Sequence, residues 1–244
     1  ADVTDGTGET RSGSRTVQVG YKALKATVSA PGWIEAHKPF EVTVRTTTLG
    51  GDPEAASGTA TVYALRAPDR VHRKALQTHR PFPGFRRGNA ARQAEPEPDL
   101  SDPNTWELGE VVAESAFETD ATGQAVLEFA LSTGHYRVKL STKDRFGGEV
   151  KALQPLRVLD PDAAQCRLTI PFVVDAPSWS AEPGETFSAV WGTGYATGRA
   201  FVEITHRGKV LQRYWTDPDR TQVRIAQEVT EAMRGGFHVH VTMV

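Results

Sequence analysis

Hydrophobic and polar residues alternate along most of this chain. The alternation has a period of two in four clear segments, at residues 40–45, 127–131, 136–141 and 237–243. A period of two places successive side chains on opposite faces of a β-strand, so each segment is typical of a strand with one buried face. Clusters of Gly, Pro, Asn and Asp lie between these segments and are typical of turns. The pattern therefore predicts many short strands.

Segments with a helical period of 3.6 are scarce, and the best helical candidate is the short stretch at residues 227–233. The apolar run at residues 168–174, which Cys166 opens, has the length of a strand. It is far shorter than the roughly 20 residues that span a bilayer. Many short strands with regular turns and without intervening helices favour an all-β fold of tandem antiparallel β-sandwiches with little helix.

Two short motifs recur in the same order in the two halves of the chain. APGW at residues 30–33 matches APSW at 176–179, and GTATV at 58–62 matches GRAFV at 198–202. Internal repetition of this kind indicates repeated structural units. We therefore predict one sandwich over residues 21–160 and a second over residues 165–244, joined by a linker at residues 159–164.

The first ten residues, ADVTDGTGET, have the composition of a binding loop. Asp2 and Asp5 suggest a cation, and the glycines Gly6 and Gly8 suggest a phosphate. However, the third glycine and following helix of a dinucleotide site are missing, as are the Gly-Lys-Ser/Thr ending of a Walker loop and the spacing of an EF-hand. The alternative is a hairpin turn in which Asp5 caps the loop and Gly8 takes a positive φ.

The hairpin interpretation gains support from a later segment of the chain. Asp5 and Gly8 align without a gap on Asp144 and Gly147, and the alignment extends to the apolar pairs Val17/Val19 and Leu156/Val158. The later segment is predicted as strand, turn and strand at the end of the first sandwich. Residues 1–20 are therefore predicted to be the closing hairpin of a preceding domain.

A long segment without periodicity, residues 66–106, interrupts the first predicted sandwich. It is rich in Pro, and its cations precede an acidic run at residues 95–102. Phosphates or an acidic polysaccharide could bind such cations, but aromatic residues for base stacking are sparse and the acidic run would repel a polyanion. We favour a solvated insertion that a trypsin-like protease would cut. The cations are Arg66, Arg70, Arg73, Lys74, Arg80, Arg86, Arg87 and Arg92.

Candidate catalytic and metal-binding residues are few. His238 and His240 share a face of one predicted strand and could ligate Zn or Ni if His206 approached them, although an exposed position on the solvent face explains them as well. Cys166 is the only cysteine, so it forms no internal disulfide, and its apolar surroundings favour a small core or edge residue. Without nucleophile or zinc motifs, we expect no enzymatic activity, metal or cofactor.

Composition and charge limit the classes of possible binding partner. The net charge is −2, and hydrophobic and charged residues make up 39% and 24% of the chain, as in ordinary globular proteins. These values point to neither nucleic acid nor direct membrane insertion.

Several motifs together resemble a known family. They are the turn of Thr119, Asp120, Gly123 and Ala125, the strand of Gly134, Tyr136 and Val138, and the turn of Asp144 and Gly147. Residues 182–215 and 229–244 of the second half add PGET, HRGKVL and a Met-to-Gly stretch before the last strand. In this order, the segments resemble the macroglobulin-like domains of bacterial α2-macroglobulin-type proteins, including the bait-region-associated domain.

The resemblance implies macroglobulin-like sandwiches, a variant of the Ig-like architecture, in a periplasmic or extracellular protein that traps proteases. In that family, cleavage of a bait segment triggers collapse around the protease, and many members carry a Cys-Gly-Glu-Gln thioester. Here Cys166 is followed by Arg167, so this chain has no such motif. We expect a non-catalytic scaffold whose partners are neighbouring domains and a target protease. Residues 70–92 would be the protease-accessible loop.

Two other hypotheses remain open at this point. The chain could belong to a cell-surface adhesion or glycan-binding array of Ig-like modules. It could also be an accessory region of an extracellular enzyme.

Overall fold

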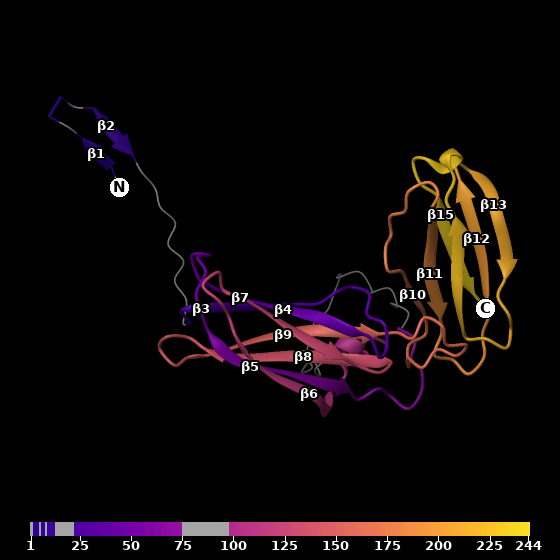
Figure 1. Ribbon diagram of the computed structural model, residues 1–244, viewed down its shortest axis with the longest axis horizontal. Helices are drawn as coiled ribbons and strands as arrows, with labels where there is room; N and C mark the ends of the chain where they lie inside the picture. Colours follow the sequence, from indigo (N-terminus) through magenta and orange to yellow (C-terminus); the bar gives the residue numbers. More distant parts are fainter. Residues whose placement is uncertain (1, 5, 8, 13–21, 75–97) are drawn as a thin grey trace, which may run out of the picture.

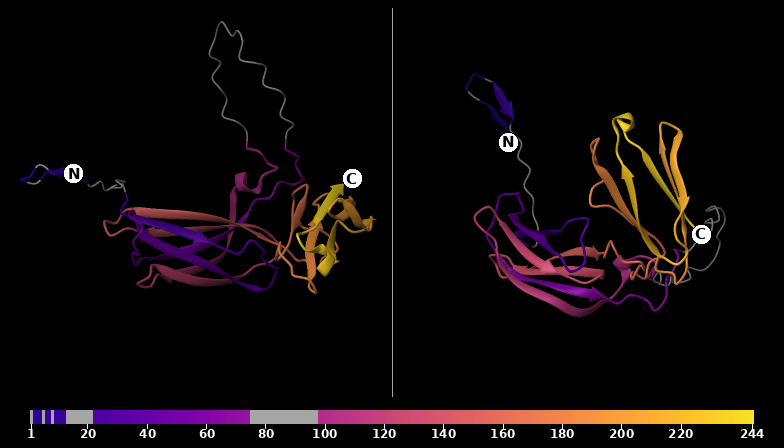
Figure 2. Two further views of the ribbon diagram at one scale, coloured as in Figure 1. Left: turned by 90° about the horizontal axis from the view of Figure 1, so that it is seen from above. Right: turned by 45° about the vertical axis from the view of Figure 1, so that its right-hand side comes forward.

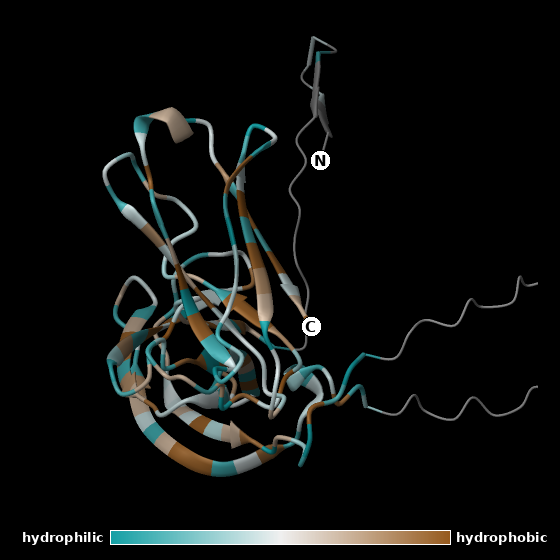
Figure 3. Ribbon diagram, turned by 90° about the vertical axis from the view of Figure 1, so that its right-hand side faces the viewer, coloured by the Kyte–Doolittle hydropathy of each residue, from teal (hydrophilic) through white to brown (hydrophobic). Residues whose placement is uncertain are grey.

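The structure is a computed structural model that describes residues 2–4, 6–7, 9–12, 22–74 and 98–244 (Figure 1). It is built from antiparallel β-sheets, as the alternation predicted. Short 3₁₀ turns at Pro103–Thr105 (η1) and Glu231–Met233 (η2) are the helical elements of the described residues. Hydrophobic and hydrophilic residues alternate along the strands (Figure 3), and many of the hydrophobic side chains are buried.

The first sandwich consists of a three-stranded and a four-stranded sheet. The order of the smaller sheet is β3-β4-β7, and the order of the larger sheet is β6-β5-β8-β9. The side chains between them form one core that includes Val42, Val62, Val138 and Leu140. The strands are β3 (Leu24–Ser29), β4 (Pro39–Thr48), β5 (Ser57–Leu65), β6 (Leu108–Glu118), β7 (Gln124–Ala130), β8 (Gly134–Lys143) and β9 (Glu149–Val158).

The second sandwich has two three-stranded sheets, ordered β10-β11-β14 and β13-β12-β15. Its core contains Trp191, Val202, Ile204 and Ile225. The strands are β10 (Val173–Asp175), β11 (Thr186–Gly192), β12 (Ala200–His206), β13 (Lys209–Trp215), β14 (Gln222–Glu228) and β15 (His238–Met243).

The two sandwiches share one strand order. Strands β3 to β8 take the same places in the first sandwich that β10 to β15 take in the second. The repeated motif GTATV/GRAFV lies at the start of the central strands β5 and β12. Each sandwich has two ends, which we name from the first sandwich. Its distal end is the end at which β9 stops, and its proximal end is the end at which β3 starts. The same words denote the equivalent ends of the second sandwich.

The family-like motifs of the first sandwich form tight turns. The Asp120 carboxylate accepts hydrogen bonds from the backbone N–H of Thr122 (2.8 Å) and Gln124 (3.0 Å). Gly123 has φ of 71°, and a Cβ there would lie 2.2 Å from the carbonyl oxygen of Thr46. The motif therefore has a structural cause, because only glycine fits this conformation and this contact.

Asp144 has a similar role in the turn between β8 and β9. Its carboxylate accepts hydrogen bonds from the backbone N–H of Ala23 (2.9 Å), Phe146 (3.0 Å) and Gly148 (2.7 Å). These bonds, led by the one from Ala23, hold the pKa of Asp144 below its usual value. The residue thus ties the start of the first sandwich to its last hairpin.

The N-terminal residues form a short hairpin of β1 (Asp2–Thr4) and β2 (Thr10–Ser12). Thr4 pairs with Thr10, which is the register in which Lys143 pairs with Glu149 at the tip of β8 and β9. This register matches the predicted alignment of the two segments. Asp5, Gly8, Val17 and Val19 lie outside the described residues, so the predicted cap and positive φ stay predictions.

Two local predictions were wrong. The helical candidate at residues 227–233 is the end of β14 followed by the short turn η2. Cys166 does not open a strand, because β10 begins only at Val173 and the residues before it form bends. In both places the packing against neighbouring segments overrides the local pattern.

Candidate functional site: the joint between the two sandwiches

The linker between the sandwiches is itself an ordered element. Leu159 pairs with Glu35 in an isolated parallel bridge: its carbonyl accepts from the N–H of Ala36 (2.7 Å), and its own N–H donates to the carbonyl of Ile34 (3.0 Å). The side chain of Leu159 is only 2% exposed. The linker is therefore fixed to the first sandwich, and the second sandwich follows at a set position (Figure 2).

An apolar cluster fills the space between the sandwiches. Trp106 and Leu159 contribute from the side of the first sandwich, and Leu168, Ile170 and Val173 contribute from the second. Trp33, Leu65 and Cys166 pack against this cluster. A shared core resists rotation of one sandwich against the other, because any rotation would expose apolar surface to water.

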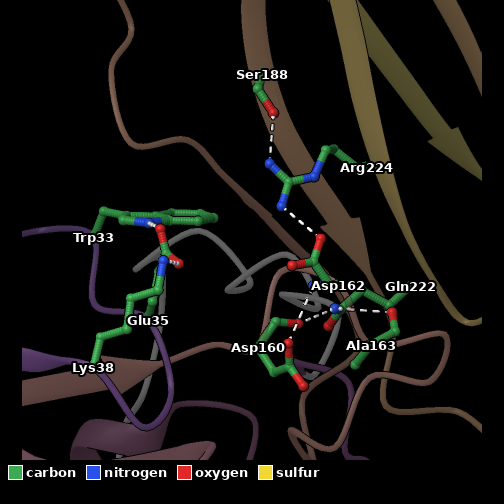
Figure 4. A network of polar contacts seen from close by, with 9 residues as sticks. All are labelled: Trp33, Glu35, Lys38, Asp160, Asp162, Ala163, Ser188, Gln222 and Arg224. Atoms are coloured by element: carbon green, nitrogen blue, oxygen red, sulfur yellow. Dashed lines mark hydrogen bonds and ion pairs between the residues drawn. The ribbon is translucent and has the colours of Figure 1, made fainter.

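Gln222 fixes the linker to the second sandwich. It lies at the start of β14 and is 1% exposed. Its Nε2 donates to the carbonyls of Asp160 (2.6 Å) and Ala163 (3.2 Å), and its backbone N–H donates to Ala164 (3.2 Å) (Figure 4). One buried amide thus donates to two linker carbonyls, of which that of Asp160 also accepts from the N–H of Ala163 (3.2 Å).

Charged side chains surround this contact. On the side of the second sandwich, Arg224 donates to Asp162 (2.8 Å) and to Ser188 (3.2 Å). On the side of the first, the carboxylate of Glu35 pairs with Lys38 and accepts from the indole N–H of Trp33 (3.1 Å) (Figure 4). The hydrogen bond from Lys38, followed by that from Trp33, lowers the pKa of Glu35, and the positive charge of Arg224 adds to this effect.

A half-buried histidine lies beside the same joint. His135 on β8 contacts the ring of Trp106 edge-on, with the ring centroids 5.2 Å apart. Burial, followed by the charge of its cross-strand neighbour Arg157, lowers the pKa of His135 to about 4. Arg157 in turn pairs with Asp175 on β10, so this ion pair connects the last strand of the first sandwich to the first strand of the second.

Both described arms of the 66–106 segment contact the joint. In the second arm, Trp106 is 3% exposed and its indole N–H donates to the carbonyl of Leu100 (3.0 Å), while Asp102 caps η1. In the first arm, the guanidinium of Arg73 lies over the ring of Tyr195 in the second sandwich and donates to its hydroxyl (3.1 Å). The arms are thus ordered, whereas the sequence predicted a solvated insertion throughout.

The structure places the predicted protease-accessible residues only in part. Arg70 and Lys74 are exposed in the first arm, and Arg73 is held by Tyr195. Arg80, Arg86, Arg87 and Arg92 lie outside the described residues. A hollow of about 590 Å³ separates the bases of the two arms, between Arg66, Arg70 and Pro68 on one side and Leu100 and Trp106 on the other.

The other candidates from the sequence do not form a reactive site in the described residues. His238 and His240 are exposed on β15, whereas His206 contacts the carbonyl of Gly236 (2.7 Å). The searched, described residues contain no cluster of three or more metal-ligating side chains. Cys166 packs at the joint, and burial raises the pKa of its thiol, which disfavours the reactive thiolate.

Sequence reasoning missed the residues that build the joint. Trp106 lies at the end of the segment without periodicity, residues 66–106, and neither it nor Gln222 stands out in the sequence pattern. An isolated tryptophan after a Pro- and Asp-rich turn was the available signal for the first, since tryptophan is usually buried. No signal marked Gln222, because a buried glutamine is defined by its partners rather than by its neighbours in sequence.

Comparisons with known proteins show a weak likeness to solved structures. A scan against protein-family models and a search of curated proteins find no match. The chain is similar to trypsin-activated α2-macroglobulin from Escherichia coli (13% identity, TM-score 0.39), with 91% of this chain and 16% of that chain covered. It is also similar to Escherichia coli α2-macroglobulin activated by porcine elastase (12%, 0.37), with 100% and 24% covered.

A third similar structure is the CARDB domain of the PF1109 protein from Pyrococcus furiosus in complex with di-metal ions (14% identity, TM-score 0.29), with 59% of this chain and 95% of that chain covered. This chain thus spans less than a quarter of the length of the two macroglobulins. Among the described residues, no helix is long and apolar enough to cross a membrane.

Proposed function

We propose that this chain is a non-catalytic scaffold segment of an extracytoplasmic, α2-macroglobulin-like protein that traps proteases. In this proposal, the joint holds adjacent sandwiches in one arrangement, and the loop rooted at the joint is the segment that a protease reaches. The partners would be neighbouring domains and a target protease.

The joint is the observation that carries the proposal. A scaffold must transmit force between domains, and a linker fixed by Leu159 on one side and by Gln222 on the other does so better than a flexible one. Ordinary tandem modules need only a short connection. Here an apolar core, the Arg157–Asp175 pair and two loop arms converge at the joint.

The loop adds support because of where it is rooted. Its arms, through Arg73 and Trp106, contact the surfaces that the joint holds together. The two arms are joined covalently through the loop. A cut in the loop would break this link, and the contacts of Arg73 and Trp106 would each become weaker. The motifs of residues 119–147 give independent support through their resemblance to macroglobulin-like domains.

Limited digestion with trypsin tests the proposal. We expect the first cuts after Arg86, Arg87 or Arg92, since Pro81 protects the bond after Arg80, followed by a change in the small-angle scattering profile as the sandwiches reorient. A variant with Arg86, Arg87 and Arg92 replaced by glutamine is the control: its loop should be cut only slowly, after Lys74 in the first arm, and its scattering should change with the same delay. Earlier cleavage within the sandwiches, or a scattering profile that stays unchanged after complete cleavage of the loop, would contradict the proposal.

A further inference from the structure

The distal end of the second sandwich carries an open aromatic cleft. Trp179, Phe187 and Phe237 line it, with ring centroids 6.1 Å apart for Trp179–Phe187 and 5.5 Å apart for Phe187–Phe237. The cleft has a volume of about 330 Å³. Trp179 is 65% exposed, which is unusual for so large an apolar side chain.

This cleft is equivalent to the surface that the first sandwich uses in the joint. His37 (φ 63°) donates its N–H to Leu131, just after β7, and Gly184 (φ 96°) donates its N–H to Val229, just after β14, at 2.8 Å in both cases. The same turn therefore precedes β4 and β11. Trp33 and Trp179 occupy the repeated motifs APGW and APSW immediately before these turns.

The two tryptophans differ in what covers them. Trp33 packs against the apolar cluster that includes Leu168 and Ile170 of the following sandwich. Trp179 has the equivalent place on the second sandwich, between β10 and β11, and it is largely exposed. The two tryptophans occupy equivalent positions, and a neighbouring sandwich covers Trp33 but not Trp179. The surface that covers Trp33 therefore indicates the kind of surface that fits Trp179.

We propose that the Trp179 cleft is a second joint surface, which docks the proximal end of another sandwich of this repeat, and that a second copy of the chain supplies that end. The contact is head to tail, because the cleft and the proximal end are different surfaces. The inference rests on the internal repeat and does not depend on protease trapping.

The proximal end of the first sandwich has matching features. Phe146, at the tip of the turn between β8 and β9, is 78% exposed beside a hollow of about 520 Å³ that Leu24 and Ala55 help to line. Lys143 and Arg145 are exposed around it, and the carboxylates of Glu54 and Glu149 line the same hollow, with Glu149 paired to Lys151. An aromatic side chain and two cations thus face outward at this end.

The rim of the Trp179 cleft carries the opposite charge. Glu182 and Glu185 are exposed beside Trp179, and the Glu182–Glu185 turn repeats the backbone bond of the Glu35–Lys38 turn in the joint. In the joint, Glu35 lies within the electrostatic influence of Arg224 from the following sandwich. The exposed carboxylates at this distal end and the exposed cations Lys143 and Arg145 at the proximal end would attract each other, which favours the orientation proposed here.

Sedimentation velocity of the full chain over a range of concentrations tests the proposal. Association between free copies lacks the linker that raises the effective concentration at the existing joint, so we expect a dissociation constant on the order of 100 µM. Trp179→Ala and Phe146→Ala should each weaken association at least about tenfold, as removal of a central aromatic anchor does. Trp215→Ala is the matched control, because Trp215 is exposed on the outer face of β13 and should leave association unchanged.

A mixture of the two variants distinguishes this contact from the alternatives. Trp179→Ala keeps its proximal end and Phe146→Ala keeps its cleft, so an equimolar mixture should recover a dimer that neither variant forms alone. A contact between two clefts would be lost in Trp179→Ala and unaffected by Phe146→Ala, and would overturn the proposal. A chain that stays monomeric at about 1 mM, ten times the expected constant, would overturn it as well.

Discussion

The two sandwiches share a strand order but differ at their distal ends. In the second, β12 and β13 are joined by the two-residue turn Arg207–Gly208, with both residues at positive φ. In the first, the equivalent connection between β5 and β6 is the long segment that begins at Arg66 and returns through Trp106. The insertion therefore lies at the one end where two sandwiches meet, and its arms became part of the joint.

This difference shows that the repeat determines the strand order of each sandwich, whereas the insertion determines how the distal end contacts a neighbouring sandwich. At both distal ends, a tryptophan and then an acidic turn precede the long strand, which is β4 in the first sandwich and β11 in the second. Only the first has Trp106 and the Leu159 bridge to complete a core against a neighbour. The following predictions compare the covered end with the open one.

Replacement of Trp106 by alanine should have the largest effect. The side chain is buried in the joint, and its removal leaves a cavity that costs about 3–5 kcal/mol of the free energy of unfolding. Trp179→Ala at the open end should cost less than about 0.5 kcal/mol in the same experiment, because its side chain is largely solvated. Urea denaturation followed by far-UV circular dichroism measures both; equal losses would mean that the two ends are equally open.

Acid should weaken the joint through His135. Its pKa is about 4 in the folded chain against 6.5 in the unfolded chain, so well above pH 6.5 it is neutral in both and has no effect. As the pH falls below 6.5, the unfolded chain binds the proton first, and stability decreases by about 2 kcal/mol by pH 4.5. The loss should be complete below pH 4.

Urea denaturation at pH 7.5 and pH 4.5 tests this expectation. His135→Gln should lose less stability between the two values than the unaltered chain, whereas His238→Gln, at an exposed position on β15, should lose as much. Carboxylates contribute to the acid response of all three proteins, so the difference isolates His135. An unaltered pH response in His135→Gln would show that this side chain is not buried as a neutral group.

Gln222→Ala should release the linker at an intermediate cost. The variant leaves the carbonyl of Ala163 without its side-chain donor and removes one of the two donors to the carbonyl of Asp160, which costs about 1–2 kcal/mol. Gln124 is the matched control, because it begins β7 in the register in which Gln222 begins β14 but is exposed. Hydrogen exchange at residues 160–164 should accelerate in Gln222→Ala alone. Equal acceleration in Gln124→Ala would mean that Gln222 does not hold the linker.

The sequence predicted the framework well because strands with one buried face leave a period-two pattern, and because the turns at Asp120 and Asp144 depend on local hydrogen bonds and on glycine conformation. It predicted the joint poorly. Leu159, Trp106 and Gln222 are distant in sequence, and their roles arise from tertiary contacts that no local pattern records. The pattern placed the linker at residues 159–164, but it did not predict that the linker is bonded to both sandwiches.

The smallest expected effect concerns the arm that only the first sandwich has. Arg73→Ala removes the contact with the Tyr195 ring, whose centroid lies 5.7 Å from the guanidinium carbon, and a hydrogen bond to its hydroxyl. Exposed contacts of this kind contribute about 0.5–1 kcal/mol, so trypsin should cut after Lys74 about two to five times faster in the variant. Tyr195→Ala should match this rate, while Tyr195→Phe, which keeps the ring and loses only the hydroxyl, should fall between. If all three variants are cut at the rate of the unaltered chain, the arm is not held by Tyr195, and the joint is maintained by its apolar core and the linker alone.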